Sequence, residues 1–167
     1  MTDIIIRAPE PRDAAALAVY MEALVAEDLG TITLRKAPTI EEEQAFIARA
    51  EAAERGFILV AMDGDRVVGL LDLFAGAREH EQHVGRFGMS TAKGWRGKGL
   101  GRRMLERAIE MTKEWPGFCR IELEVLPHNT AAIHLYESLG FVLEARREKG
   151  TNIRGSPEDI LMMALVW

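Results

Sequence analysis

The chain has 167 residues, of which 48% are hydrophobic and 28% charged, and its formal net charge is −5. This length predicts a single domain over residues 1–167, with enough apolar side chains for a core that needs neither disulfides nor a metal. The negative charge argues against non-specific binding to nucleic acid. No apolar run approaches the roughly 20 residues of a membrane helix, so no membrane partner is expected. The lone Cys119 and an N-terminus without a basic or apolar leader predict a cytoplasmic protein.

The first predicted elements are a strand and a helix. Residues 4–7 form an apolar strand, and Pro11 with Asp13 then opens a helix. The apolar positions of this helix are Leu17, Val19, Leu24 and Val25.

A second helix and a hairpin follow. Thr39 and Glu42 have the spacing of a capping box, which predicts a helix through about residue 53. Gly56 is expected to stop this helix. Two apolar runs, 57–62 and 66–74, flank Asp63-Gly64, and this dipeptide favours a tight antiparallel hairpin.

The second half repeats strand and helix signals after a polar loop over residues 75–82. The predicted strands cover residues 83–91, 120–126, 141–148 and 160–166, and the predicted helices cover 100–114 and 129–139. The full order, β-α-α-β-β-β-α-β-α-β-β, predicts an α/β (α+β) fold in which helices cover the faces of a mixed sheet.

A glycine loop, Arg96-Gly97-Lys98-Gly99-Leu100-Gly101, joins a predicted strand to a predicted helix. Glycines at a helix start let backbone N–H groups approach phosphate oxygens. A P-loop would need Lys and Ser/Thr at the places of Leu100 and Gly101, and the Rossmann glycine spacing is also absent. The loop alone therefore predicts either a phosphate cradle of another kind or an ordinary glycine-rich turn.

A second motif lies downstream, where Asn129 and Tyr136 follow the strand Ile-Glu-Leu-Glu-Val of residues 121–125. Asn is a favoured helix N-cap, so Asn129 has a structural interpretation as well as a functional one. Tyr136 lies seven residues further, about two helical turns, which places it on nearly the same face.

With these two motifs in this order, the chain resembles the GNAT superfamily of acetyl-CoA-dependent N-acetyltransferases. The loop 96–101 is similar to the family's pyrophosphate loop, and residues 123–141 are similar to its second half. The resemblance implies a mostly antiparallel sheet of six to seven strands with helices on both faces and one splayed parallel strand pair. It also implies acetyl-CoA as co-substrate in that opening, and no metal.

The resemblance assigns the donor-binding residues. The pantetheine arm would pair with the strand near Met89, Ser90 and Thr91, and Asn129 would contact the same arm. The pyrophosphate would be held by Arg96, Gly97, Lys98, Gly99, Leu100 and Gly101. Arg102 and Arg103 either add charge near the phosphates or are solvated helix residues.

The same resemblance assigns two catalytic roles. Tyr136 would protonate the departing thiolate. Glu124, twelve residues earlier, has the spacing of the base in the ribosomal-protein alanine N-acetyltransferase branch. The alternative for Glu124 is a solvated or salt-bridged strand carboxylate. Glu79, Glu81 and His83 are the other candidate bases, and their segment is expected to be a polar loop, not a metal cluster.

The sequence leaves the acceptor open. A small-molecule amine is favoured, because the segments expected to flank the acceptor look short and show no peptide-binding signature. The segment 146–159, expected to be a strand end and a polar loop, contains no tyrosine, which argues against specificity for a protein N-terminus. Residues 25–36 are expected to form the other wall. A protein N-terminus or lysine, a non-catalytic acyl-CoA sensor and a nucleotide-binding protein are the alternatives. An exposed edge strand over residues 160–166 would suit a homodimer.

Overall fold

The computed structural model describes residues 3–30 and 36–167. Residues 31–35, part of the expected wall 25–36, lie outside the described residues. The strands and helices are β1 (Ile5–Arg7), α1 (Ala14–Ala26), α2 (Ile40–Ala52), β2 (Gly56–Asp63), β3 (Arg66–Ala75), β4 (Val84–Thr91), α3 (Leu100–Lys113), β5 (Arg120–Val125), α4 (Thr130–Ser138), β6 (Val142–Ile153) and β7 (Ser156–Val166). Short 3₁₀ turns cover Pro11–Asp13, Glu79–Glu81 and Lys93–Trp95. Within this described part, no helix is both long and apolar enough to cross a membrane.

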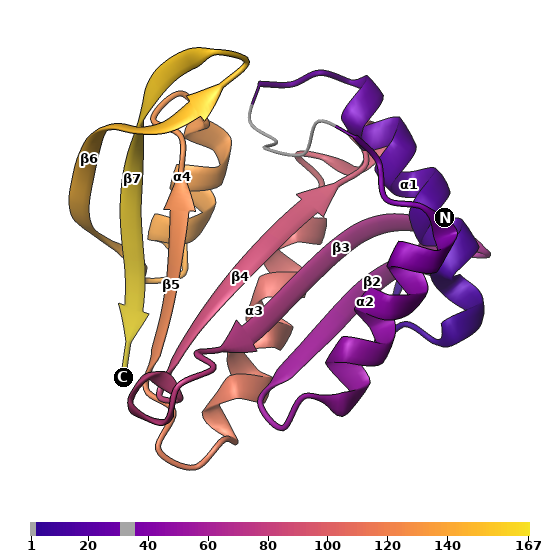
Figure 1. The fold of residues 1–167 in the computed structure, drawn as a ribbon, viewed down its shortest axis with the longest axis horizontal. Coiled ribbons are helices and arrows are strands. Elements are labelled where there is room, and N and C mark those ends of the chain that lie inside the picture. The colour runs from indigo at the N-terminus through magenta and orange to yellow at the C-terminus, as the bar shows by residue number, and fades with distance from the viewer. Residues whose placement is uncertain (1–2, 31–35) are drawn as a thin grey trace.

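The described strands form one seven-stranded sheet in the order β1-β2-β3-β4-β5-β7-β6. Neighbouring strands run antiparallel except β4 and β5, which run parallel. Helices α1 and α2 cover one face over β2 and β3, and α3 and α4 lie behind the sheet (Figure 1). This mixed sheet with helices on both faces confirms the predicted fold class.

Apolar clusters on the two faces of the sheet form the core. On one face, Leu17 of α1 and Ile47 of α2 pack over Val60 of β2. On the other face, Met104 and Leu105 of α3 pack against β3 and β5. Because β2 and β3 are covered on both faces, they appear in the sequence as continuous apolar runs and do not alternate.

Several predicted boundaries are confirmed. The Glu42 backbone N–H donates to Thr39 Oγ1 (3.2 Å) and the Thr39 N–H donates to Glu42 Oε2 (2.7 Å), which is the predicted capping box. The predicted hairpin joins β2 to β3 at Gly64, which has a positive φ of 59°.

One detail of the first half was wrong. Gly56 is not a helix stop but the first residue of β2, where an added Cβ would lie 2.3 Å from the Phe74 ring. Close packing therefore explains this glycine. Val19 faces solvent with 67% of its surface exposed, because α1 buries the neighbouring side of the helix through Leu17, Tyr20 and Leu24.

The predicted loop 146–159 was also wrong, because β6 and β7 continue through it as a long hairpin. The central turn residues Arg154 and Gly155 have positive φ angles of 53° and 85°, as a type I′ turn requires. The hairpin is largely exposed, so its side chains are polar and lack the alternation that marks a half-buried strand. The sheet edge is β6, not 160–166, because β7 pairs with both β5 and β6.

The parallel pair β4–β5 is short. Its register covers only Val84 to Arg86 against Arg120 to Glu122, and beyond these residues the strands diverge (Figure 1). Gly85 lies at the base of this fork, where an added Cβ would lie 2.7 Å from Phe118 and 3.0 Å from Leu73. The fork thus begins at a position too crowded for a larger side chain.

Replacing Gly85 by alanine should destabilise the fold by about 1–3 kcal/mol, because buried Phe118 and Leu73 have no room to move. Urea unfolding would measure this change. Gly94→Ala is the matched control, since a Cβ there meets nothing within 4 Å, and it should leave the midpoint nearly unchanged. Equal midpoints for the two variants would contradict the crowding at the fork.

Candidate active site

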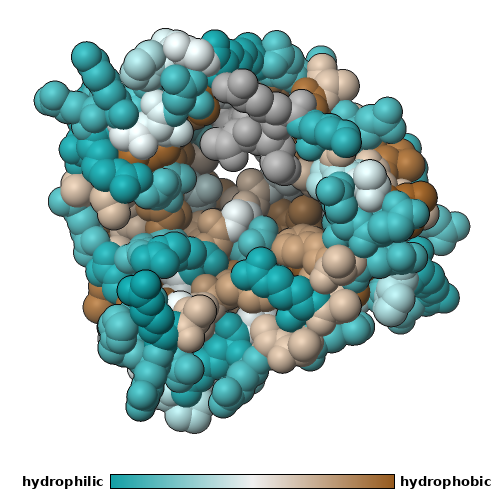
Figure 2. All heavy atoms as spheres, in the orientation of Figure 1, coloured by the Kyte–Doolittle hydropathy of each residue, from teal (hydrophilic) through white to brown (hydrophobic). Residues whose placement is uncertain are grey.

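Two cavities meet where β4 and β5 separate. The front cavity, about 690 Å³, lies on the α1 side and is lined by α1, β3, β4, β5, β6 and β7. The loop cavity, about 590 Å³, is lined by the glycine loop, the start of α3 and α4. Figure 2 shows the hollow of the front face, with hydrophilic residues around its rim. The two cavities share five lining residues: Leu24, Met89, Ser90, Asn129 and Tyr136.

The glycine loop is open to a ligand. Gly97 and Gly99 have positive φ angles of 70° and 79°, and a Cβ at either would meet nothing within 4 Å. Gly99 is the N-cap of α3 and brings no capping side chain. The first N–H groups of a helix have no intrahelical acceptor, so those at the start of α3 are free to bind an anion. The loop therefore fits the diphosphate of acetyl-CoA.

The Arg96 side chain holds the loop to α1. Its guanidinium makes two hydrogen bonds to Glu27, at 2.7 and 2.9 Å, and its Nε donates to the Thr91 carbonyl at 3.0 Å. Lys98 Nζ lies 5.6 Å from the centre of the Trp95 ring. In this arrangement the Arg96 side chain fixes the shape of the loop, while the backbone of residues 97–101 lies toward the cavity.

The remaining basic residues of this region make surface contacts. Arg102 donates to Ser138 Oγ at 2.5 Å and pairs with Glu106 at 3.3 Å. Arg103 is exposed and donates to the Ile4 carbonyl at 3.4 Å. Arg102 lines the loop cavity and Arg103 does not. Of the two, only Arg102 is therefore placed to add positive charge near a phosphate in that cavity.

The strand segment predicted for the pantetheine arm has an open edge. Met89, Ser90 and Thr91 pair with β3 on one side only, because the β4–β5 register ends at Arg86. Their outer backbone groups are thus available to a bound chain in the manner of an added strand. The Ser90 hydroxyl accepts a hydrogen bond of 2.9 Å from Tyr20, whose burial raises its pKa to about 12.

Asn129 and Tyr136 lie where the two cavities join. Asn129 Oδ1 accepts the Ala132 N–H at 3.4 Å, so its N-cap interpretation is confirmed. Tyr136 is 8% exposed and packs edge-on against Phe87, with ring centres 5.7 Å apart. Burial raises the pKa of Tyr136 to about 12, so the phenol carries its proton at neutral pH. A proton donor needs that form.

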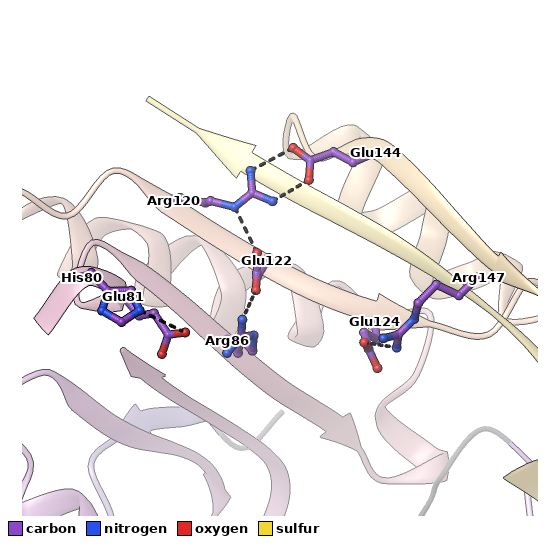
Figure 3. Close-up of polar contacts among 8 residues, drawn as sticks. All are labelled: His80, Glu81, Arg86, Arg120, Glu122, Glu124, Glu144 and Arg147. Carbon is purple, nitrogen blue, oxygen red and sulfur yellow. Dashed lines mark hydrogen bonds and ion pairs between the residues drawn. The ribbon is translucent and has the colours of Figure 1, made fainter. Parts of the chain in front are cut away.

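Glu124 lines the front cavity with Tyr136 but lies on its rim. Its side chain is 51% exposed and forms an ion pair with Arg147 of β6 (Figure 3). Glu124 is therefore salt-bridged, which is one of the alternatives that the sequence left open. The alternative bases Glu79, Glu81 and His83 line neither cavity. Within residues 3–30 and 36–167, no group of three His, Cys, Asp or Glu side chains is placed to hold a metal.

A row of alternating charges crosses the base of the fork (Figure 3). Arg120 of β5 donates to Glu144 of β6 at 2.8 Å and to Glu122 at 3.0 Å, and Arg86 of β4 pairs with Glu122 at 2.6 Å. These contacts join three strands at the closed end of the front cavity. They also leave these two glutamates and two arginines mutually neutralised.

Sequence reasoning missed Asp72, in the middle of β3 on the wall of the front cavity. Burial raises the pKa of Asp72 to about 6, and the charge of Arg49 on α2 offsets part of that rise. The signal was present, since Asp72 interrupts the apolar run 67–74. Burying a carboxylate costs folding free energy, and a buried carboxylate with a shifted pKa beside a cavity is a candidate functional residue.

A helix start open to an anion, an open strand edge and a second cavity are features that suit an enzyme with a phosphorylated donor and a separate acceptor. Residues 21–141 match the acetyltransferase (GNAT) family, and the chain belongs to this family. The family comprises acetyl-CoA-dependent N-acetyltransferases, which confirms the predicted enzyme class and donor.

Known relatives agree with this assignment. The L-amino acid N-acetyltransferase AaaT of Escherichia coli K12 is 33% identical over 65% of this chain and 67% of its own length. The [ribosomal protein bS18]-alanine N-acetyltransferase of the same strain is 37% identical over 47% of this chain and 53% of its own. The chain thus spans about half to two thirds of these relatives.

A solved structure extends the likeness to the whole fold. The crystal structure of a GNAT-family acetyltransferase from Streptococcus pneumoniae has a TM-score of 0.92 and 29% identity, covering 99% of this chain and 100% of that one.

Asp72 predicts a pH effect on stability. Its folded pKa of about 6 lies above the ordinary aspartate pKa of 3.8, so the folded state holds the proton more tightly. This contribution is complete below about pH 4 and is lost as pH rises through 6, at a cost on the order of 3 kcal/mol. Asp72→Asn should therefore be more stable than the wild type at pH 7.5.

Unfolding midpoints measured from pH 4 to 8 would test this effect. Asp65→Asn, in the exposed β2–β3 turn, is the matched control and should follow the wild type throughout. If the stability of Asp72→Asn falls as steeply as that of the wild type between pH 4 and 6, the assignment of this pH dependence to Asp72 is wrong.

Proposed function

We propose that the protein transfers the acetyl group of acetyl-CoA to the primary amine of a small molecule, by direct attack in a ternary complex. The observation that carries the proposal is the junction of the two cavities at Tyr136. A donor entering from the loop cavity and an amine entering from the front cavity meet there, at the open edge of β4.

The donor would be bound by the backbone and side-chain groups that line the loop cavity. The N–H groups of residues 97–101 and the positive end of the α3 dipole suit the diphosphate. Met89, Ser90 and Thr91 would pair with the pantetheine arm, and the Asn129 amide would contact the same arm. A backbone N–H near Met89 or Ser90 is suited to stabilise the oxyanion that forms during attack.

Two side chains of the front cavity would move protons. Only a neutral amine attacks a thioester, and an alkyl ammonium is mostly charged at pH 7, so a base is needed. The sequence predicts Glu124 for this role, but Glu124 is paired with Arg147 and would have to leave it to reach the amine, so another carboxylate of the front cavity is the alternative. Tyr136, buried and protonated, would give its proton to the departing thiolate.

The size of the front cavity favours a small acceptor. Its volume of about 690 Å³ is within the range of small-molecule sites. The name of the amino-acid acetyltransferase relative supports the same class. The ribosomal-protein relative keeps a protein N-terminus as the alternative acceptor.

An amine panel tests the proposal. Purified protein with acetyl-CoA should release free thiol with amino acids, polyamines or other small amines, and less with peptides that carry a free N-terminal alanine or a lysine. Faster reaction with the peptides would reverse the acceptor assignment. Acetyl-CoA binding without thiol release from any amine would make the protein an acyl-CoA sensor.

A homodimer and a cytoplasmic location stay predictions. The dimer would use the β6 edge, where Val142 and Leu143 are 59% and 57% exposed. Light scattering on purified protein would give the oligomeric state.

Removing the Tyr136 hydroxyl should lower kcat by roughly 100-fold or more, the usual size of a general-acid contribution. Tyr136→Phe keeps the ring contacts with Phe87 and Phe141, so the KM for acetyl-CoA should change little. Steady-state kinetics would separate these two effects. An unchanged kcat would remove Tyr136 as the acid.

The glycine loop offers a binding test. In Gly99→Ala, the φ of +79° is unfavourable for alanine, so the unbound loop should relax to another conformation and acetyl-CoA would have to restore the original one. At about 1–2 kcal/mol for that backbone, the Kd for acetyl-CoA should rise roughly tenfold. Gly94→Ala is the matched control, because Gly94 lines neither cavity and lacks a positive φ. Calorimetry with both variants would measure the difference, and equal Kd values would contradict the cradle.

A further inference from the structure

We propose that Asp72 of β3, in place of Glu124, accepts the proton of the acceptor's ammonium group. This inference rests on the proposed acetyl transfer and names the residue that makes the amine reactive. No sequence motif points to Asp72, and the assignment comes from its place in the front cavity.

The Asp72 carboxylate is accessible from the front cavity. Asp72 pairs across the strands with Gly88 of β4, and both face the α1 side of the sheet. A Cβ at position 88 would lie only 3.0 Å from Asp72 Oδ1. Gly88 therefore leaves the space beside the carboxylate open, and both residues line the front cavity. An acceptor in that cavity reaches Asp72 at the point where the fork has opened.

The charged side chains of the front cavity also favour Asp72. Each glutamate of the front cavity has an arginine: Glu122 has Arg86 and Arg120, Glu144 has Arg120, and Glu124 has Arg147. Within the described residues, no other side chain makes a hydrogen bond or ion pair with Asp72. The three arginines and three glutamates balance, so Asp72 brings one unmatched negative charge, which suits a single ammonium group.

The surroundings of Asp72 on each packed element are consistent with this role. The charge of Arg49 on α2 offsets part of the rise that burial causes in the pKa of Asp72, but the Arg49 guanidinium stacks 4.4 Å from the centre of the Phe74 ring and makes no ion pair with Asp72. Helix α1 presents apolar Met21 and Leu24 to the cavity, and Tyr20 is bonded to Ser90. The other charged groups are those of β4, β5 and β6 already described: Arg86, Arg120, Glu122, Glu124, Glu144 and Arg147.

Burial also brings the pKa of Asp72 closer to the pH at which a base must work. A base works best when its pKa lies near the working pH, and burial raises the pKa of Asp72 to about 6. At pH 7 most of the carboxylate is ionised and ready to take a proton. Glu124, by contrast, is half exposed on the rim and bound to an arginine.

The step is balanced as follows. The ammonium gives one proton to Asp72, and the neutral nitrogen forms a bond with the thioester carbonyl carbon. The carbon–sulfur bond breaks as the thiolate takes the Tyr136 proton. The remaining extra proton on nitrogen returns to Tyr136 through water, and Asp72 releases its proton to solvent. The products are the acetamide, the free thiol of CoA and one proton.

Rates measured against pH would test this assignment. With the best amine of the panel, the wild-type kcat/KM should fall below about pH 6 as Asp72 becomes protonated. Asp72→Asn should lower kcat roughly 100-fold or more and abolish that acid limb, with an unchanged Kd for acetyl-CoA. Glu124→Gln should keep the limb, and Asp65→Asn, outside both cavities, should match the wild type.

A second variant tests access without removing the carboxylate. Gly88→Ala should lower kcat less than Asp72→Asn does and should shift the acid limb, because its Cβ crowds Oδ1. An active Asp72→Asn with an intact acid limb, or loss of the limb in Glu124→Gln alone, would overturn the inference. Absence of turnover in the wild type would instead overturn the proposed function, and this inference with it.

Discussion

The short parallel contact between β4 and β5 is the constraint on which the rest of the site depends. Three residues on each strand pair, and an arginine–glutamate row with a crowded glycine closes the fork there. Beyond that point the backbone of β4 has lost one partner, which is normally costly inside a sheet. The same unpaired edge gives a ligand chain a place to bind, and the two cavities open on either side of it.

The two cavities differ in kind. The loop cavity relies on backbone: glycines with positive φ, the first turn of α3 and the open edge of β4. Such groups recognise features that every molecule of one donor shares. The front cavity relies on side chains from several elements, and seven of these side chains are charged: Asp72, Arg86, Arg120, Glu122, Glu124, Glu144 and Arg147. Its chemistry can change by substitution while the backbone of the loop cavity stays the same, and members of this family are named for different acceptors.

Local signals in the sequence were enough for the order of most elements, and two motifs together were enough for the family. Thr39 with Glu42 and the Asp63-Gly64 turn act through neighbours in the chain, so pattern alone located them. The β6–β7 hairpin was missed because an exposed hairpin has no apolar alternation. Asp72 is visible in the sequence as an interruption of an apolar run, but its access to the front cavity depends on Gly88, a cross-strand partner that only tertiary structure supplies.

The raised pKa of Asp72 has a consequence for any attempt to improve this protein. At neutral pH, the ionised Asp72 carboxylate lowers the stability of the fold, because it lies in an otherwise apolar strand. Selection for heat resistance alone, carried out without an activity screen, would tend to replace that residue early, because a neutral side chain relieves the fold at once. Thermostable variants obtained in that way would bind donor and remain well folded, yet leave the amine charged.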